Sequence, residues 1–453
     1  MSGRPASGKQ GAGVQSRALA AELVRRILSD RAYSQRVLHK ALDEHPLAAD
    51  DRAFVTHLTY GTLTWLRVLD EAIEAAAARP VSALDEDLLA TLRVGAFQLL
   101  ILHDTIPAFA VVNAAVEGVR ARRGRGAAGF VNALLRRLSR EAAVWRPSPL
   151  PPQSVAEIAA RGSLPDWIAA ELVLAVGHEG AWRELCAMNA PTPVTLRMSA
   201  ADHTTREQKA ALGLAPHPWL RDAWVSTPGQ SAWREQVLAG AFVVQDAGAQ
   251  VVGEIARGLA PDRVLDACAG VGTKTSHLAS LLPEATLVAT DRHPRKLDVL
   301  SRTLRGVTRA QPVETAVWEA GLQPPPPKLS PAFDLVIVDA PCSALGTLGR
   351  HPEVRWHRRP EDVAALVAVQ ARLLDACALL VRPGGHLLYT VCTFTRTEGP
   401  EQIERFLKER PAWRGVSLGS SLPAALQEPS GGLLLPSRDA SDAFYLGLAQ
   451  RVA

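Results

Sequence analysis

The sequence predicts a multidomain protein, with an N-terminal all-α bundle, a small middle domain and a C-terminal α/β domain built on a parallel, Rossmann-like sheet. Apolar residues recur at helical spacing up to about residue 146, without strand-like alternation. From about residue 236, short apolar strands alternate with helical segments, which is the pattern of βαβ units. At 453 residues the chain is also too long for one typical core, so we expect several domains.

Composition limits the class of protein. Hydrophobic residues make up 47% and charged residues 21% of the chain, which are ordinary values for a soluble globular protein, and the formal net charge is only +4. No run of about 18 uncharged apolar residues occurs, and the N-terminus lacks a secretory apolar region. Five cysteines without a C-x-x-C pair argue against disulfides and structural zinc. We therefore expect a cytoplasmic protein with no metal and no membrane partner.

The N-terminal part is expected to comprise a disordered Gly/Ser-rich tail at 1–15 and a helical domain at 16–146. Asp85 can cap a helix whose apolar residues recur at helical spacing, namely Leu88, Leu92, Ala96 and Leu99. Eight arginines between Glu117 and Arg146 form a possible phosphate footprint, and a solvated helix face explains them equally well. The candidate nucleic-acid contacts among them are Arg120, Arg122, Arg123 and Arg125.

A proline-rich linker at 147–152 is expected to be stiff. It leads into a small middle domain at 153–235, which mixes tryptophan-bearing helical stretches with one strand candidate, Val194–Met198. We expect this domain to bridge the helical domain to the C-terminal domain.

The C-terminal domain, at 236–453, has a strong strand pattern. Asp442–Tyr445 is expected to lie in a late strand with a packing role. The earlier strand candidates are Arg263–Cys268, Thr286–Asp291, Asp334–Asp339 and His386–Cys392. In an open parallel sheet, the carboxyl ends of the strands line the binding crevice.

The first of these strands runs into a loop with glycines at 270 and 272, which let the backbone approach a ligand closely. Asp291 ends the next strand, 21 residues after Gly270, where an acid can accept hydrogen bonds from a ribose diol. An NAD fingerprint would need glycine at Thr275, and a Walker A loop would need glycine at Thr273. These features favour a nucleoside without a phosphate, and S-adenosyl-L-methionine fits that description.

Two cysteines follow apolar strands of the same domain. Cys342 lies just after Asp339, and Cys392 ends the strand candidate that begins at His386. A buried strand-end thiol would explain either cysteine alone, but two thiols and a carboxylate at one sheet edge suggest covalent chemistry on an electrophilic carbon. Cys268 is expected to pack within the cofactor loop, and Cys186 and Cys377 are expected to lie in cores.

Several segments resemble the RsmB (Sun) branch of the Nop/Sun family of RNA cytosine-C5 methyltransferases. In the C-terminal half they are Asp266–Thr275, Asp339-Ala340-Pro341-Cys342-Ser343, His351-Pro352-Glu353-Val354-Arg355-Trp356 and Tyr389-Thr390-Val391-Cys392-Thr393. The N-terminal half is similar to NusB-type RNA-binding helical domains at Val111–Glu117 and Gly129–Arg137. The resemblance implies a NusB-like bundle joined to a class I methyltransferase fold that acts on 16S rRNA. Separately, we expect a monomer.

The resemblance also implies the roles of individual residues. Cys392 would be the nucleophile that adds to C6 of cytosine, Cys342 would assist product release, and Asp339 would contact the base and could protonate N3. The inverted assignment stays open, because DNA cytosine methyltransferases use the cysteine of a Pro-Cys pair, here Pro341-Cys342. The expected cofactor residues are Cys268, Ala269, Gly270, Val271, Gly272, Thr273, Lys274, Asp291, Glu314 and Asp339, and the expected RNA contacts in this half are Arg350, His351, Arg355 and Trp356.

The chain departs from the family pattern in the cofactor region. The family usually has Ala-Pro-Gly-Gly where this chain has Gly270-Val271-Gly272-Thr273, and Glu314 is the nearest candidate for the aspartate expected near the adenine. The altered loop leaves open a catalytically idle RNA-binding or antitermination factor. Methylation of tRNA or DNA also stays open, because the catalytic motifs do not encode the target.

Overall fold

The computed structural model describes residues 7–145, 151–199, 202–307, 312–327, 329, 332–419, 422–424 and 431–452. The chain falls into two compact units. The helical unit comprises residues 1–189 together with 348–357, and the sheet unit comprises residues 190–347 together with 358–453. Among the described residues, no helix is both long and apolar enough to cross a membrane.

The helical unit is all-α, as the periodicity predicts. Its first helix begins at Ser7, so the expected disordered tail is wrong for residues 7–15. Extending an existing helix fixes one residue for each hydrogen bond, and a glycine-containing stretch can therefore continue it. The elements are α1 (Ser7–Ser29), α2 (Ser34–Glu44), α3 (Ala49–Thr64), α4 (Leu66–Ala77), η1 (Val81–Ala83), α5 (Glu86–Leu100), α6 (Ala108–Trp145), α7 (Val155–Arg161), α8 (Asp166–Asn189) and α14 (Val354–His357).

Two local features of this unit follow directly from the sequence. Asp85 caps α5, because its side chain accepts hydrogen bonds from the backbone N–H groups of Asp87 and Leu88. Helix α6 is kinked at Gly124, whose φ of 82° interrupts the helical backbone. The arginine cluster at 120–125 therefore surrounds a turn between two helical segments.

The expected middle domain at 153–235 is divided between the two units. Helices α7 and α8 belong to the helical unit, where Gly162 approaches Leu185 so closely that an added Cβ would lie 2.0 Å from Leu185 Cδ2. The proline-rich segment therefore does not end the helical unit, and residues 147–150 of it lie outside the described residues. The strand predicted at Val194–Met198 is confirmed as β1 (Thr195–Met198).

This strand belongs to a small sheet with the order β2-β3-β1-β4, in which all pairs are antiparallel. The small sheet and its helices comprise α9 (Arg206–Ala211), β2 (Leu214–Pro216), β3 (Ala223–Ser226), α10 (Arg234–Leu238) and β4 (Phe242–Val244). Its strands are only three or four residues long, too short for alternation to reveal them in the sequence.

The main sheet follows the order β10-β12-β9-β8-β5-β6-β7, with β11 paired to β12. Strands β5 to β9 are parallel, whereas β10, β11 and β12 pair antiparallel. The elements are α11 (Ala247–Leu259), β5 (Arg263–Asp266), α12 (Thr273–Leu281), β6 (Thr286–Asp291), α13 (Pro294–Thr303), η2 (Leu304–Gly306), β7 (Glu314–Val317), β8 (Phe333–Asp339), η3 (Leu345–Thr347), α15 (Pro360–Ala378), β9 (Val381–Val391), α16 (Pro400–Glu409), β10 (Trp413–Gly415), β11 (Gly432–Leu434), α17 (Pro436–Asp439) and β12 (Phe444–Arg451).

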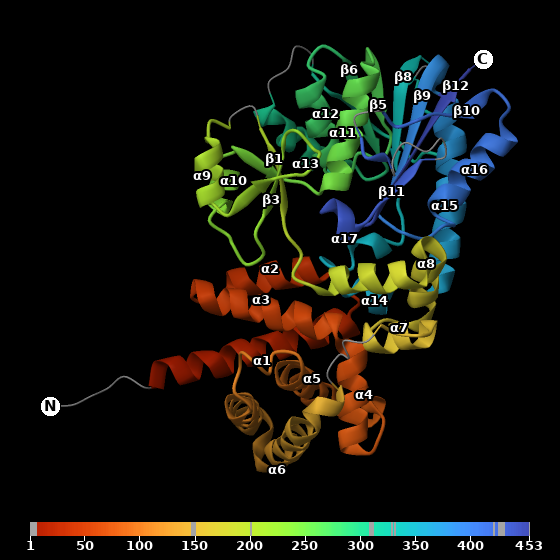
Figure 1. Cartoon of the computed structure of the whole chain (residues 1–453). Helices are drawn as coiled ribbons and strands as arrows, with labels where there is room; N and C mark the ends of the chain where they lie inside the picture. The colour runs from red at the N-terminus through yellow and green to blue at the C-terminus, as the bar shows by residue number, and fades with distance from the viewer. Residues whose placement is uncertain are drawn as a thin grey trace. The chain divides into compact units, whose positions relative to one another are not determined.

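Helices cover both faces of the main sheet, which explains why its central strands are apolar throughout. In β8, Leu335 and Ile337 pack in one core cluster with residues of α11 and α12. The alternate residues Val336 and Val338 pack in another cluster with residues of α15 and α16. Figure 1 shows α11 and α12 on one side of the sheet and α15 and α16 on the other. The strand order reverses between β5 and β8, and ligands bind at such a switch point.

Candidate functional site

The loops that follow β5, β8 and β9 meet at the switch point of the main sheet. Backbone hydrogen bonds continue the ladder past the strand ends, from Ala267 N to Ile337 O (2.9 Å) and from Ala340 N to Thr390 O (3.0 Å). They bring the two expected catalytic cysteines together, with Cys342 Sγ 3.3 Å from Cys392 Sγ. Both cysteines are half-buried free thiols. The convergence predicted from the two strand ends is therefore present in the structure.

Asp339, at the end of β8, is held by two donors. Lys274 Nζ donates to its Oδ2 at 2.6 Å, and Thr390 Oγ1 donates to its Oδ1 at 2.9 Å. Burial lowers the pKa of Lys274, but the charges of Asp339, Cys392 and Asp266 and the hydrogen bond to Asp339 outweigh it, so this pKa is raised overall. Lys274 is therefore an ammonium at neutral pH, and it links the loop that follows β5 to Asp339.

The Cys392 thiol is protonated in the resting site. Its pKa lies well above the ordinary value, first because of its hydrogen bond with Cys342, then because of burial and the nearby charges of Cys342 and Asp339; Lys274 opposes these effects. Nucleophilic attack by a thiol needs the thiolate. The site must therefore remove a proton from Cys392 before this residue can attack.

The loop between β5 and α12 takes the conformation that its glycines allow. Gly270 has a φ of 57° and Gly272 a φ of 90°, both in the region that disfavours side chains. Asp291 holds this loop, because its Oδ2 accepts a hydrogen bond from Gly270 N at 3.1 Å and its Oδ1 accepts one from His293 N at 2.8 Å. The predicted pairing of this loop with Asp291 is thus present.

Asp266, at the end of β5, bears on whether the residues at this sheet edge suit S-adenosyl-L-methionine. Its Oδ2 accepts a hydrogen bond from Thr275 Oγ1 at 2.7 Å, but its buried Oδ1 has no partner among the described residues. Burial is the main cause that raises the pKa of Asp266 to about 6. An unpaired buried acceptor beside a glycine loop suits a ligand that carries a cationic or hydroxyl donor. An ammonium group and a ribose diol both provide such donors.

The other residues expected in the cofactor loop differ in exposure. Ala269 is buried, Val271 is exposed, and Thr273 begins α12. Burial is the main cause that raises the pKa of the Cys268 thiol well above its ordinary value, which fits the expected packing role. Cys377 is buried as expected, whereas Cys186 is exposed and the expectation that it lies in a core is wrong.

Glu314 does not lie at the site, and its expected role near the adenine is wrong. It is the first residue of β7, exposed, and it pairs in register with Val288 near the start of the visible β6–β7 ladder. The binding edge lies at the other end, where Asp291 pairs with Val317. Glu319 lies two residues past that end, and its Oε1 is 3.8 Å from Arg292 Nη1. The sequence alone does not show which end of β7 lies at the binding edge, because that depends on how β7 pairs with β6.

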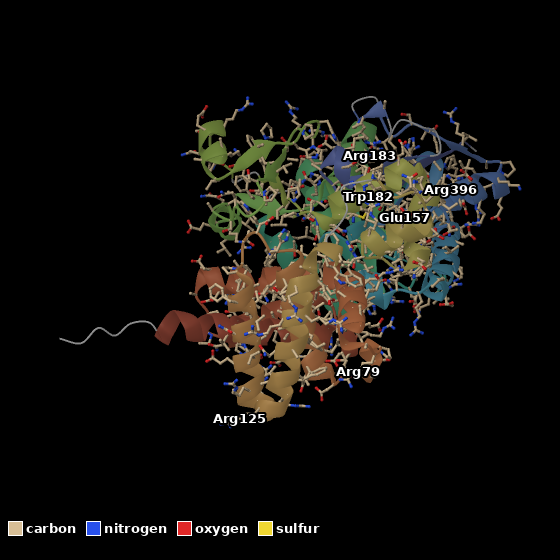
Figure 2. All side chains as sticks on the ribbon, turned by 60° about the horizontal axis from the view of Figure 1, so that its bottom comes forward. Arg79, Arg125, Glu157, Trp182, Arg183 and Arg396 are labelled. Carbon is tan, nitrogen blue, oxygen red and sulfur yellow. The ribbon has the colours of Figure 1, made fainter. Side chains whose placement is uncertain are left out.

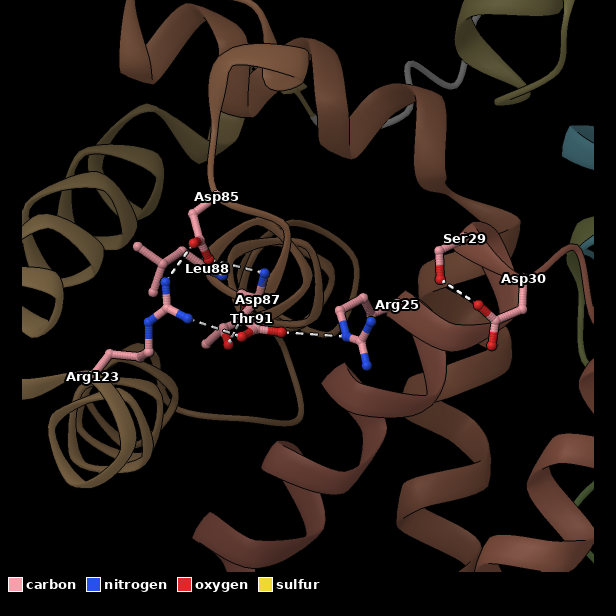
Figure 3. Close-up of polar contacts among 8 residues, drawn as sticks. All are labelled: Arg25, Ser29, Asp30, Asp85, Asp87, Leu88, Thr91 and Arg123. Atoms are coloured by element: carbon pink, nitrogen blue, oxygen red, sulfur yellow. Dashed lines mark hydrogen bonds and ion pairs between the residues drawn. The ribbon is translucent and has the colours of Figure 1, made fainter.

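The expected RNA contacts on α6 are exposed. Arg120, Arg122, Arg123 and Arg125 surround the kink, and Figure 2 shows the Arg125 side chain at the tip of α6. Arg123, however, is engaged by acids of α5, because it forms ion pairs with Asp85 and Asp87 (Figure 3). Its charge is therefore partly neutralised within the fold, while no ion pair is recorded for Arg120, Arg122 and Arg125 in the described part of the chain.

Residues 348–357, in which RNA contacts were expected, belong to the helical unit. Arg355 is fully buried in the helical unit, where its guanidinium donates to Thr64 O at 3.0 Å and to Asn189 Oδ1 at 2.6 Å. Burial lowers its pKa to about 9, so it remains charged at neutral pH. The prediction that Arg355 contacts RNA is wrong, because a sealed guanidinium that is bonded within the protein has no surface to offer a phosphate.

Its neighbours are also engaged in this unit. Trp356 Nε1 donates to Leu63 O at 2.7 Å, and buried Glu353 accepts a hydrogen bond from Ser34 N at 3.0 Å. His351 Nδ1 lies 3.8 Å from Glu353 Oε1, and Arg350 is half-buried. The segment thus contributes packing and hydrogen bonds to the helical core. RNA contact by Arg350, His351 and Trp356 stays a prediction.

Comparisons with known proteins agree with this architecture. The model of the 16S rRNA methyltransferase RsmB/F family matches residues 258–450, and the NusB family model matches residues 14–140. The ribosomal RNA small subunit methyltransferase B of Xanthomonas campestris pv. campestris is 34% identical and covers 96% of this chain and 97% of its own length. The probable ribosomal RNA small subunit methyltransferase B of Synechocystis sp. is 32% identical over 96% of this chain and 98% of its own length.

A solved structure shares the fold of the whole chain. The crystal structure of PH0851 has a TM-score of 0.74 and 23% sequence identity, and covers 96% of this chain and 98% of its own. A fold at this identity says nothing about activity by itself. The two relatives above 30% identity, which span almost the whole chain, show that it belongs to the 16S rRNA methyltransferase RsmB/F family and carries an N-terminal NusB family domain.

Proposed function

We propose that the protein methylates C5 of a cytosine in 16S rRNA, using S-adenosyl-L-methionine and a covalent cysteine–C6 adduct, as a cytoplasmic monomer. The observation that carries the proposal is the 3.3 Å separation of the Cys342 and Cys392 sulfurs at the sheet edge that also holds the Asp339–Lys274 pair and the glycine loop. Two thiols are needed if one attacks C6 and the other assists release of the product.

The cofactor would be held by the loop at 268–274 and by two carboxylates. Asp291 sits where an acid can bind a ribose diol, and the unpaired Oδ1 of Asp266 can accept a hydrogen bond from an ammonium group. When bound, S-adenosyl-L-methionine supplies an electrophilic methyl group to C5 of the activated cytosine. Lys274 lies at the start of α12, between this loop and Asp339, and it would also balance negative charge in the pocket.

Cys392 would act as the nucleophile. Its sulfur loses the thiol proton as it bonds to C6; Cys342, already a thiol, cannot keep that proton, so the proton ends on the base. Once the methyl group is on C5, the C5 proton would pass to a base, for which Asp339 is available, and on to solvent; the bond from sulfur to C6 then breaks and the thiolate leaves. Cys342 stands close enough to the reacting sulfur to assist this second step. Its position is therefore suited to the role that the family resemblance assigns to it.

The Asp339–Lys274 pair would manage the proton at N3. Asp339 receives hydrogen bonds from Lys274 and Thr390, which fix the position of its side chain. As Cys392 adds to C6, the proton that its thiol loses can pass by way of Asp339 to N3, so that thiol and base give a neutral adduct while Lys274 stays an ammonium. The same proton returns when the thiolate leaves. Asp339 then contacts the base throughout the reaction, as expected from the sequence.

A trapping experiment tests this assignment. RNA containing 5-fluorocytosine should form a covalent complex with the wild-type protein and with C186A, because Cys186 is an exposed thiol outside the site. C392A should form no complex, and C342A should accumulate a complex even with unmodified RNA. A complex with C392A but none with C342A would instead establish the inverted assignment.

Two further measurements separate the remaining alternatives. Calorimetry should show binding of S-adenosyl-L-methionine; a folded protein that binds RNA but not this cofactor would be an idle RNA-binding factor. Bisulfite sequencing of rRNA, tRNA and DNA from a deletion strain should show loss of one 5-methylcytosine in 16S rRNA. A loss confined to tRNA or DNA would reject the proposed substrate.

A further inference from the structure

Glu398 is a fully buried carboxylate six residues after Cys392, between β9 and α16. We propose that it is a positioning residue that ties the loop of Cys342 (residues 340–347) to the loop of Cys392 (residues 392–399), and so holds the two sulfurs in register. This inference rests on the proposed function, because it concerns the thiols of that reaction.

The Glu398 carboxylate accepts four hydrogen bonds. Its Oε1 accepts from Ser343 N at 2.8 Å and from Gln370 Nε2 at 3.0 Å. Its Oε2 accepts from Ser343 Oγ at 2.5 Å and from Thr395 Oγ1 at 2.9 Å. Ser343 directly follows Cys342, and Thr395 lies three residues after Cys392. One carboxylate therefore bridges the residues that flank both thiols.

Additional hydrogen bonds complete the link. Ser343 Oγ lies 3.0 Å from Thr393 Oγ1, which joins the residues that follow the two cysteines. Gln370 Nε2 also donates to Pro341 O at 2.9 Å, on the other side of Cys342. Tyr389 OH, from β9, donates to Glu398 O at 2.6 Å and fixes the backbone of the residue itself. Each cysteine is thus held through its immediate neighbours.

Burying the Glu398 carboxyl group costs free energy, which indicates that this residue does more than fill the core. In the described part of the chain, Glu398 forms no ion pair with a lysine or arginine, and its partners are neutral. A buried carboxyl group without a neighbouring cation is costly unless its oxygens are hydrogen-bonded, and apolar residues usually stabilise a core at least as well. The donors come from the residues around the two thiols and from Gln370, which also binds the loop of Cys342.

A positioning role has a clear kinetic consequence. Attack on C6 and later release require both sulfurs to keep their places relative to one base. A displacement of about 1 Å in a reacting group can lower the rate roughly 100-fold. Loss of the carboxylate frees the Ser343 and Thr395 donors, so the two loops are held together by fewer hydrogen bonds, chiefly Gly346 N to Cys392 O and Ser343 Oγ with Thr393 Oγ1, and the sulfurs can shift.

The chain offers a conservative variant that separates charge from geometry. In E398Q, the amide oxygen can accept from Ser343 N and Gln370 Nε2, while the amide NH2 group can donate to the hydroxyls of Ser343 and Thr395, which rotate to accept. In E398A, all four hydrogen bonds are lost. Glu401, three residues further on and 46% exposed, gives the matched control E401A.

The first readout is steady-state methylation of RNA. We expect E398A to lower kcat about 100-fold, while KM for RNA and Kd for S-adenosyl-L-methionine stay within about threefold of wild type. E398Q and E401A should remain within about threefold in kcat. Thr395→Val keeps the side-chain shape but removes one donor, so it should lower kcat less than E398A and serves if E398A does not fold.

The second readout needs no methylation activity. Diamide oxidises two neighbouring thiols: the Cys342 and Cys392 sulfurs form an S–S bond, and their two electrons and two protons reduce the diamide azo bond to a hydrazine. Mass spectrometry of unreduced peptides follows this crosslink. It should form at the same rate in wild type, E398Q and E401A, and roughly tenfold more slowly in E398A, because the sulfurs lose their effective concentration.

The outcomes distinguish the two proposals. Unchanged kcat and unchanged crosslinking in E398A or T395V, with only a lower melting temperature, would mean that Glu398 acts in stability alone and would overturn the inference. If wild type does not methylate cytosine but the crosslinking series follows the expected order, the proposed function fails while Glu398 still positions the thiols. Loss of kcat in E398A with recovery in E398Q supports the inference.

Discussion

Replacing Gly272 with alanine tests whether the cofactor loop depends on a backbone conformation that glycine alone adopts easily. The φ of this residue is 90°. A Cβ added here would lie 2.7 Å from Leu300 Cγ, 3.1 Å from Leu300 Cβ and 3.2 Å from Leu300 Cα. Leu300 is fully buried in α13, and the contact with its Cα means that backbone must move.

The expected loss of stability has two parts. A non-glycine residue in left-handed backbone costs about 1–2 kcal/mol. Forcing an extra methyl group against a packed core typically costs about 1–3 kcal/mol more. Together these make roughly 2–5 kcal/mol, which is a large share of the roughly 5–15 kcal/mol that stabilises a typical protein.

Gly270 provides the matched control in the same loop. Its φ is 57°, and no atom lies within 4 Å of an added Cβ. G270A should therefore lose only the backbone part, about 1–2 kcal/mol.

A chain of two units need not unfold in one step. Urea unfolding should therefore be monitored by hydrogen exchange in peptides from β5 and β6, which reports on the sheet unit alone. Calorimetry with S-adenosyl-L-methionine reports on the loop itself. G272A should unfold at lower urea and bind the cofactor more weakly than G270A. Equal unfolding free energies for the two variants would refute the reasoning from Leu300.

Three other predictions follow from the same structure. R355A should destabilise the helical unit by roughly 2–4 kcal/mol, because it leaves the acceptors at Thr64 and Asn189 unpaired. R125A should leave stability unchanged and lower the salt dependence of RNA binding. A stability loss in R125A with a lowered salt dependence in R355A would contradict both assignments. Asp266 has a folded pKa of about 6 against the ordinary 3.8, so its protonated form favours folding below about pH 4, and this contribution is lost as pH rises through 6. In urea unfolding, D266N should therefore gain up to roughly 3 kcal/mol of stability relative to wild type between pH 4 and pH 7. Unfolding free energies of the two proteins that stay parallel over this pH range would contradict the prediction. Iodoacetamide should label Cys392 slowly at pH 7 and with a rate still rising at pH 9, because its pKa is raised by the hydrogen bond with Cys342 and by burial; a plateau below pH 8 in peptide mass spectrometry would contradict it.

The parts of the fold that local sequence determines were predicted well. The strand at Thr286–Asp291 was predicted with the bounds that the structure shows, and β8 differs by one residue. Apolar runs that end in a carboxylate carry this signal, because a central parallel strand is buried on both faces. The position of Cys342, Cys392 and Asp339 at one sheet edge was predicted in the same way, since parallel strands end on the same side of a sheet.

The misses depend on contacts between distant parts of the chain. Nothing local distinguishes Arg355 from the neighbouring Arg358 and Arg359, yet it is bonded to residues more than 160 positions away. The role of Glu398 was invisible for the same reason, since two of its partners, Ser343 and Gln370, lie in other elements. Glu314 was misplaced because the choice between the two ends of β7 depends on its pairing with β6.

The segment 348–357 has a consequence for any attempt to divide the protein. The polypeptide leaves the sheet unit after Thr347, lends ten residues to the helical unit and returns at Arg358. In a fragment that starts at residue 190, Val354 and Arg355 would therefore be exposed to solvent without the partners that bury them in the helical unit. The complementary fragment, ending at residue 189, would carry a slot with open carbonyls at Thr64 and Leu63. The helical unit is therefore discontinuous in sequence, and a single cut of the chain cannot yield it whole.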